Sequence, residues 1–254
     1  MKGSLALITG ASAGIGAASA RRFAAVGANL VLWARREDRL IELGTELREA
    51  HGVDVHTARV DVRDREAVNK AAAQLLRDLG TPDLLLNNAG LASGLSFLQD
   101  GDHEDWDRMI DTNLKGLLNV TRAILPAMVE RGTGHVINIG STAGHQVYPK
   151  GNVYNATKFG VKALTEGMNL DVSGTGIRVS SVDPGFVETE FSVVRFHGDA
   201  ERAEGVYQGF TPLSGDDVAD VVLFVATRPP HVNLHDVVLL PTAQRNVYVL
   251  DRNE

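Results

Sequence analysis

The sequence predicts an α/β protein built on one doubly wound sheet of seven parallel strands, with helices on both faces. Three observations predict this fold. Short β-branched or apolar runs alternate with longer segments of helical apolar spacing, a glycine-rich turn follows the first run, and polar residues or glycines follow most later ones. We therefore expect ligands to bind beyond the carboxyl ends of the strands.

Seven segments are predicted to be strands, because each is a short β-branched or apolar run. They are Leu5–Thr9, Asn29–Ala34, Val53–Val60, Leu84–Asn87, His135–Gly140, Arg178–Val182 and Val237–Leu240. The apolar spacing between them predicts helices near 17–27, 37–50, 64–79, 103–130, 155–173 and 215–227. Right-handed crossovers between parallel strands then give a Rossmann-type arrangement.

Length and composition narrow the classes of protein. No linker or repeat divides the 254 residues, so we expect one domain over 1–254. The formal net charge of −7 argues against nucleic acid as a partner, and no apolar run approaches the length of a membrane span. The chain has no cysteine, and its eight histidines show no paired ligand spacing, so we expect no metal. These features indicate a cytoplasmic protein.

A glycine-rich turn joins the first predicted strand to the first predicted helix. It reads Thr9-Gly10-Ala11-Ser12-Ala13-Gly14-Ile15-Gly16. Its glycines allow a tight turn, and the helix N-terminus offers backbone amides to an anion such as a pyrophosphate. The alternative is an ordinary glycine-rich turn, which the flanking strand and helix disfavour.

Two arginines, Arg35 and Arg36, follow the second predicted strand, where a site specific for NAD usually presents a carboxylate. A guanidinium can bind a 2′-phosphate through two hydrogen bonds, so the pair favours NADP as the cofactor. In the alternative interpretation, the arginines merely begin a solvated helix together with Glu37 and Asp38.

An acid/base pair is predicted at Tyr154 and Lys158. Four residues apart on a predicted helix, they share one face, where the Lys158 ammonium is expected to lower the pKa of the phenol. Ser141 follows a predicted strand, and a loop can bring its hydroxyl beside the phenol to orient a substrate oxygen. Each residue alone is more typical of a surface contact or a turn.

These motifs together resemble a short-chain dehydrogenase/reductase from end to end. The segments that carry the resemblance are Thr9 to Gly16, Asp61-Val62, Asn87-Asn88-Ala89-Gly90, the tetrad Asn113, Ser141, Tyr154 and Lys158, and Pro184-Gly185. The resemblance implies that Tyr154 exchanges a proton with the reacting oxygen while Lys158 also holds the nicotinamide ribose. It further implies that Asn113 anchors a water that relays protons to Lys158; the alternative for Asn113 is a structural, helix-distorting role.

The motifs and the resemblance also imply which residues bind NADP. The implied set is Gly10, Ser12, Ala13, Gly14, Ile15, Gly16, Arg35, Arg36, Asp61, Val62, Asn88, Ala89, Gly90, Tyr154, Lys158, Pro184, Gly185, Val187 and Thr189.

Within the family, the chain resembles bacterial NADP-dependent 3-hydroxy acid dehydrogenases, which act on serine and allo-threonine. Segments 134–144, 151–154, 190–196 and 230–233 carry this similarity, which implies a homotetramer acting on small 3-hydroxy acids. Arg195, in an expected lid over 186–212, is the candidate partner of the substrate carboxylate beside Ser141 and Tyr154, and Lys150 is the second candidate. Where that group has two small residues before Thr-Glu-Phe, this chain has only Glu188, which predicts a lid of different shape.

Three other functions remain open at this point. A broad-specificity NADPH-dependent ketone reductase would share every catalytic residue. A 3-oxoacyl carrier-protein reductase would share them too, but those enzymes typically end with a glycine pair after the seventh strand, whereas this chain continues Leu239-Leu240-Pro241-Thr242. A non-catalytic NADP-binding sensor would keep the fold, although the complete tetrad argues against it.

Overall fold

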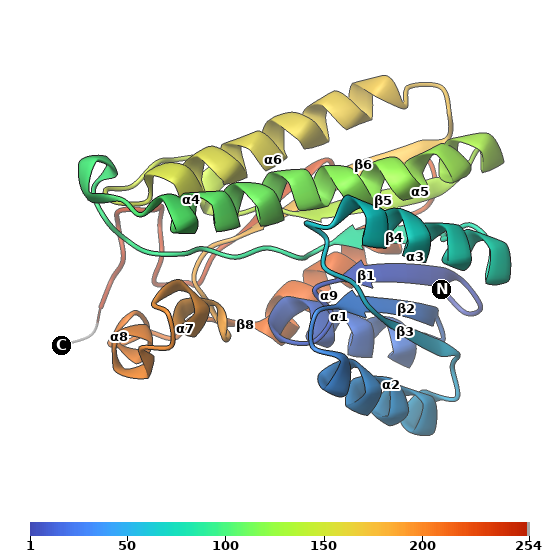
Figure 1. The fold of residues 1–254 in the computed structure, drawn as a ribbon, viewed down its shortest axis with the longest axis horizontal. Coiled ribbons are helices and arrows are strands. Elements are labelled where there is room, and N and C mark those ends of the chain that lie inside the picture. The colour runs from blue at the N-terminus through green and yellow to red at the C-terminus, as the bar shows by residue number, and fades with distance from the viewer. Residues whose placement is uncertain (253–254) are drawn as a thin grey trace.

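The computed structural model describes residues 1–252 and contains the predicted seven-stranded parallel sheet (Figure 1). The strand order is β3-β2-β1-β4-β5-β6-β9, so the direction of winding reverses between β1 and β4. The strands are β1 (Leu5–Thr9), β2 (Asn29–Ala34), β3 (Val55–Arg59), β4 (Leu84–Asn87), β5 (Gly134–Ile139), β6 (Ile177–Pro184) and β9 (Asp236–Leu239). The Rossmann-type prediction is confirmed.

Helices cover both faces of the sheet because successive side chains of each strand point to opposite sides. Ala6 and Ile8 of β1 pack with helices α1 (Gly14–Ala25), α2 (Glu37–His51) and α9 (Gly215–Ala226). Leu7 packs on the other face, with α3 (Arg65–Asp78) and α5 (Leu117–Arg131), and α6 (Asn152–Asp171) lies on that side too (Figure 1).

The helix predicted near 103–130 is interrupted. The structure has α4 (His103–Ile110), a π-helical turn at Asp111–Gly116, and then α5. Within this turn, the Asn113 side chain hydrogen-bonds to the backbone of Leu91, in the loop after β4. Helical structure therefore runs through the whole predicted range, and the interruption is a change from α-helical to π-helical hydrogen bonding at Asp111–Gly116.

The segment between β6 and α9 holds short elements that the sequence did not predict. Strands β7 (Val187–Glu188) and β8 (Leu213–Ser214) pair in parallel, and helices α7 (Phe191–Arg195) and α8 (Ala200–Gly205) lie between them. In Figure 1, α7 and α8 stand apart from both helical layers. Short 3₁₀ turns occur at Leu98–Asp100 and Thr142–Gly144. Among residues 1–252, no helix has the length and apolar character needed to cross a membrane.

Candidate active site

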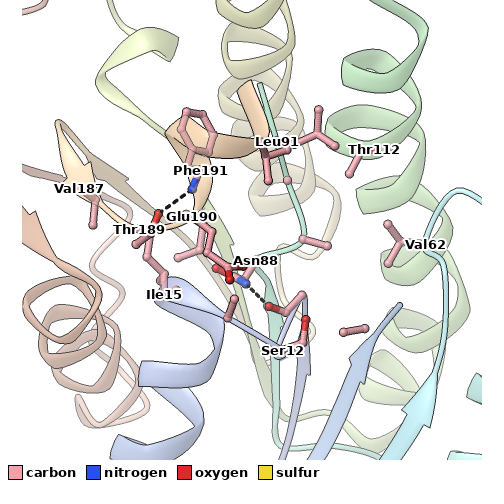
Figure 2. Close-up of a pocket in the computed structure, with 18 of the residues that line it drawn as sticks. Ser12, Ile15, Val62, Asn88, Leu91, Thr112, Val187, Thr189, Glu190 and Phe191 are labelled. Carbon is pink, nitrogen blue, oxygen red and sulfur yellow. Dashed lines mark hydrogen bonds between the residues drawn. The ribbon is translucent and has the colours of Figure 1, made fainter. Parts of the chain in front are cut away.

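A cavity of about 330 Å³ lies beyond the carboxyl ends of the strands, where the parallel-sheet argument places a ligand. Its wall combines loops that follow β1 to β6 with residues of the segment before α7 (Figure 2). Eighteen of the nineteen residues predicted to bind NADP line it, Tyr154 and Lys158 among them, and so does Ser141. Gly16, Asn113 and Arg195 lie outside this wall.

The turn between β1 and α1 depends on glycine. Gly10 and Gly14 have positive φ angles of 64° and 51°, which side chains rarely adopt. A Cβ on Gly16 would lie 2.5 Å from both the Gly10 carbonyl oxygen and the Asn88 side-chain nitrogen. Gly16 therefore allows the close packing of this turn, although it does not itself line the cavity.

The N-terminus of α1 is open toward the cavity. Its N-cap residue is Ala13, which provides no side-chain hydrogen bond, and the first turn contains no acidic residue. By contrast, Asp64 caps α3 and Ser214 caps α9. Because the first amides of a helix need acceptors, the absence of a cap leaves this helix end suited to an anionic ligand.

Asn88 holds the loop after β4 against the loop after β1. Its side-chain amide donates to the Thr9 carbonyl at 2.9 Å and to the Gly10 carbonyl at 3.2 Å. The Thr9 hydroxyl in turn accepts from the amides of Asn88 and Ala89. These hydrogen bonds join the two halves of the sheet at the point where the winding reverses.

The two predicted arginines, Arg35 and Arg36, differ in their contacts. Arg35 lines the cavity, and Arg36 donates to the Ser12 hydroxyl at 3.3 Å and to the Glu190 carboxylate at 2.8 Å. A third arginine that the sequence analysis did not single out, Arg39, binds the other oxygen of Glu190 at 2.6 Å. Arg36 is thus more than the start of a solvated helix, because it reaches both the glycine-rich turn and the segment before α7.

Asp61 and Val62 line the cavity after β3. The Asp61 carboxylate pairs with Arg63 at 2.6 Å, and hydrogen bonds from the Arg63 side chain lower the pKa of Asp61. Arg35 adds a smaller electrostatic contribution in the same direction. Asp61 is therefore ionised in the wall of the cavity.

Tyr154 lies buried in the wall, with 8% of its surface exposed. Burial raises the pKa of its phenol, while the nearby Ser141 hydroxyl and the Arg195 charge act in the opposite direction. The net shift contradicts the lower pKa expected from the Lys158 spacing. Lys158 lies on the same helix, but its ammonium is 6.0 Å from the phenol ring centre and donates to the Ile139 carbonyl at 2.9 Å.

Burial lowers the pKa of Lys158 to about 8, and the negative charge of Asp183 opposes this shift. Asp183 is 2% exposed and lies against Gly140, next to the Ile139 carbonyl that Lys158 binds. Its carboxylate accepts from the His145 ring at 2.6 Å, a contact that the sequence analysis missed. No sequence signal links these residues, because they meet only when β5 and β6 pair.

His145 and Asp183 also form, with Asp236, a group of three side chains whose ligand atoms lie within 4.8 Å of one another. The ammonium of Lys162 lies beside this group, with its Nζ 3.2 Å from Nδ1 of His145 and 3.3 Å from a carboxylate oxygen of Asp236. The lysine supplies the positive charge that the two carboxylates require.

Asn113 is buried outside the cavity wall, and both the oxygen and the nitrogen of its side-chain amide are hydrogen-bonded. The amide accepts from Leu91 N at 2.9 Å and donates to Leu91 O at 2.8 Å and to the Thr157 hydroxyl at 3.0 Å. Thr157 donates to the Tyr154 carbonyl. The Asn113 side chain therefore ties the loop at Leu91 to α6 through Thr157.

Arg195 lines a second, smaller recess that shares Tyr154 with the main cavity. Its guanidinium carbon is 5.7 Å from the Tyr154 ring centre, and its Nε donates to the Gly94 carbonyl at 3.2 Å. Within residues 1–252, the terminal guanidinium nitrogens make no hydrogen bond or ion pair. Lys150 lines the same recess and lies over the Phe97 ring.

Further cavity residues escaped sequence reasoning. Phe191 packs edge-on against the Tyr154 ring at 5.7 Å, and Val194 lines the wall one helical turn later. Thr112 precedes Asn113, and its buried hydroxyl has no hydrogen-bond partner among the described residues. For Thr112, the one sequence feature that could have indicated a place in the site is its position next to Asn113. Phe191 could not be predicted, because its place depends on the path of the chain after β7.

Fold and cavity together are those of a Rossmann-type protein with a candidate tyrosine-lysine acid/base site. The family model described as short chain dehydrogenase matches residues 4–199. This chain belongs to the short chain dehydrogenase family, as its sequence motifs predicted.

Relatives with assigned activities match almost the whole chain. A protein named NADP-dependent 3-hydroxy acid dehydrogenase, from Salmonella typhi, is 47% identical over 94% of this chain and 96% of its own. Sulfoacetaldehyde reductase 2 of Chromohalobacter salexigens is 45% identical over 98% and 99%. A structure of serine dehydrogenase in a closed form with NADP⁺ is 43% identical, covers 98% of this chain and 100% of its own, and superposes with a TM-score of 0.91.

Proposed function

We propose that this chain is an NADP-dependent oxidoreductase that transfers a hydride between the cofactor and small 3-hydroxy acids or their 3-oxo acids. The observation that carries the proposal is one cavity that spans from the arginines after β2 to Ser141 after β5, with Tyr154 and Lys158 beside that serine. The similarity to 3-hydroxy acid dehydrogenases and to serine dehydrogenase supports the same activity.

The wall of the cavity fits a dinucleotide phosphate. The uncapped N-terminus of α1 offers its amides to the pyrophosphate, and Arg35 and Arg36 offer guanidinium groups to a 2′-phosphate. Thr112 provides a buried hydroxyl without a partner among the described residues, which a polar ligand group can satisfy. Lys158 lies at the opposite end, where it would hold the nicotinamide ribose.

The bound cofactor supplies or accepts the hydride, and the side chains of this chain manage the proton and the orientation of the substrate. Tyr154 donates a proton to the carbonyl oxygen during reduction, because burial keeps its phenol protonated. Ser141, whose hydroxyl also accepts from Ala143 N, orients that oxygen. Lys158 adds positive charge beside the forming alkoxide, most fully below its pKa of about 8.

Arg195 is the proposed partner of the substrate carboxylate. It is half-buried beside the Tyr154 ring, and its terminal nitrogens are free of protein partners within residues 1–252. A carboxylate held there would place the third carbon of a hydroxy acid near the phenol. Lys150 across the same recess is the second candidate.

A sulfonate is the second candidate for the anionic end of the substrate. Sulfoacetaldehyde reductase 2 is as similar to this chain as the hydroxy acid dehydrogenases are. A sulfonate carries the same charge as a carboxylate, and the guanidinium of Arg195 can bind either. Both candidates are small anionic carbonyl or hydroxy compounds.

Kinetics with NADPH and NADP⁺ test the proposal. Serine, allo-threonine, 3-hydroxybutyrate, sulfoacetaldehyde and a neutral ketone form the panel, and the substrates that carry a carboxylate or a sulfonate should have the higher kcat/KM. A preference for the neutral ketone would favour the broad-specificity reductase, and binding of NADPH without any turnover would favour the sensor. Tyr154→Phe should lower kcat at least about 100-fold while NADPH binding persists.

Arg195→Ala should raise KM for anionic substrates and leave the neutral ketone unaffected. Arg202→Ala is the matched control, because it removes the same charge from the same segment at an exposed position over Phe196. Equal effects of the two variants would exclude a specific role of Arg195 in holding the anion.

The remaining organisation is proposed on the same basis. We propose that 1–254 form one catalytic domain and that 186–212 act as a substrate lid. We also propose that four copies assemble, as the sequence resemblance implies, and that the protein is cytoplasmic, as its sequence features indicate. Size-exclusion chromatography with light scattering tests the tetramer.

A further inference from the structure

The most informative feature outside the predicted site is the carboxylate of Glu190, a residue of the cavity wall just before α7 (Figure 2). One oxygen binds Arg36 at 2.8 Å, and the other binds Arg39 at 2.6 Å. These hydrogen bonds lower the pKa of Glu190, so the carboxylate is ionised at neutral pH. An anion of the protein therefore occupies the guanidinium proposed to bind a 2′-phosphate.

We propose that Glu190 competes with the 2′-phosphate of NADP(H) for Arg36, so that binding of the phosphate releases the start of the lid from the β2–α2 corner. The inference rests on the proposed function, because it assumes that Arg36 contacts the 2′-phosphate. Arg36 has one planar guanidinium, and its Nε already donates to Ser12. A phosphate that takes the remaining donors must displace the carboxylate or share Arg36 with a like charge.

The residues next to Glu190 extend the effect of this competition to both ends of the site. Thr189 lies close to Gly14: a Cβ added to that glycine would be 3.3 Å from the Thr189 side chain. Phe191 packs edge-on against Tyr154. Glu190 thus fixes a short stretch that touches both the glycine-rich turn and the acid/base tyrosine, and its release would loosen Phe191 over Tyr154.

The expected size of the effect is modest, because the ion pair is accessible to water. The side chains of Arg36 and Glu190 are 42% and 44% exposed, and exposed pairs are weak and screened by salt. The Glu190–Arg39 pair is equally exposed and therefore also weak, so it does not hold the segment once Arg36 is lost to the phosphate, and the competition weakens binding without preventing it. We expect removal of the Glu190 charge to tighten binding of a 2′-phosphate about three- to fivefold.

Calorimetry with adenosine 2′,5′-bisphosphate and 5′-AMP measures this effect without turnover. Glu190→Gln should bind the bisphosphate about three- to fivefold more tightly than the native chain at low salt and should bind 5′-AMP equally well. Glu188→Gln is the control: it removes the same charge two residues earlier, from an exposed side chain that has no ion pair within residues 1–252. An unchanged or weaker affinity of Glu190→Gln for the bisphosphate would overturn the proposal.

Hydrogen exchange over 187–205 supplies the conformational readout. Adding the bisphosphate to the native chain should speed exchange in this segment, whereas Glu190→Gln should exchange fast with or without it. Unchanged exchange in the native chain would overturn the release step. If the native chain binds 5′-AMP as tightly as the bisphosphate, the proposed preference for NADP is wrong. If the native chain prefers the bisphosphate but Glu190→Gln binds it with the same affinity, only the proposed competition is wrong.

Discussion

Replacement of Asn113 by alanine separates the two roles considered for this residue. The substitution removes the side-chain amide but keeps the backbone carbonyl, which would be the group left to hold a water. We therefore expect Asn113→Ala to act mainly through lost hydrogen bonds. The loop at Leu91 and the hydroxyl of Thr157 would lose their anchor, and both adjoin the candidate acid/base site.

The magnitude follows from the contacts. The amide makes three buried hydrogen bonds of 2.8 to 3.0 Å, and each such bond contributes about 1 kcal/mol net, so the loss is about 3 kcal/mol. Asn119→Ala is the matched control on α5. Its side chain donates one partly buried hydrogen bond of 2.9 Å, to the Val62 carbonyl, and should cost about 1 kcal/mol.

Urea denaturation followed by circular dichroism, at one protein concentration, gives the free energy of unfolding of both variants. We also expect the kcat/KM of Asn113→Ala to fall, because Leu91 lines the cavity. Equal losses of unfolding free energy for Asn113→Ala and Asn119→Ala would refute the structural role. An unchanged free energy with a large loss of kcat would instead indicate a direct role in proton transfer.

Two further predictions concern the buried His135 and the glycines of helices α1 and α6. Burial lowers the pKa of His135 to about 3, so as the pH falls below about 6.5 the histidine takes up a proton in the unfolded chain but not in the folded chain. The free energy of unfolding should therefore fall by about 2 kcal/mol between pH 7 and pH 5. In urea titrations, His135→Gln should abolish that loss, whereas the control His56→Gln, at an exposed position, should retain it. Gly16→Ala should weaken NADPH binding, because the added Cβ would clash with the Gly10 carbonyl. Gly167→Ala, in open space on α6, should instead raise the free energy of unfolding by about 0.5–1 kcal/mol. Unchanged NADPH binding by Gly16→Ala would contradict this account of the turn.

The sheet could be predicted because its signals are local. Leu5–Thr9, Asn29–Ala34 and Leu84–Asn87 match β1, β2 and β4 to the residue, since each is a buried apolar run bounded by polar or flexible residues. The elements β7 and β8 have two residues each and exist only because they pair with one another across 24 intervening residues. Hydrophobic periodicity cannot detect strands of that length.

From the sequence, contacts between side chains could be predicted only for residues that belong to one local motif. The glycine turn and the tyrosine-lysine pair follow from spacing along the chain, and the structure places them in one cavity wall. The contact of Glu190 with Arg36 and Arg39 spans more than 150 residues and carries no local signal. The direction of the Tyr154 pKa shift was mispredicted because spacing shows proximity to Lys158 but not the burial of the phenol.

Burial acts on both members of the acid/base pair in the direction of the neutral form. It raises the pKa of Tyr154 and lowers that of Lys158, so the protein alone favours a protonated phenol, which is the form that reduction requires. Oxidation requires the phenolate, and its negative charge needs a cation nearby in this buried wall. Arg195 lies over the Tyr154 ring and already opposes the rise in its pKa. The arginine proposed to hold the substrate anion is therefore also placed to stabilise the phenolate, and a substrate carboxylate that neutralises it would shift the site toward the protonated, reducing form.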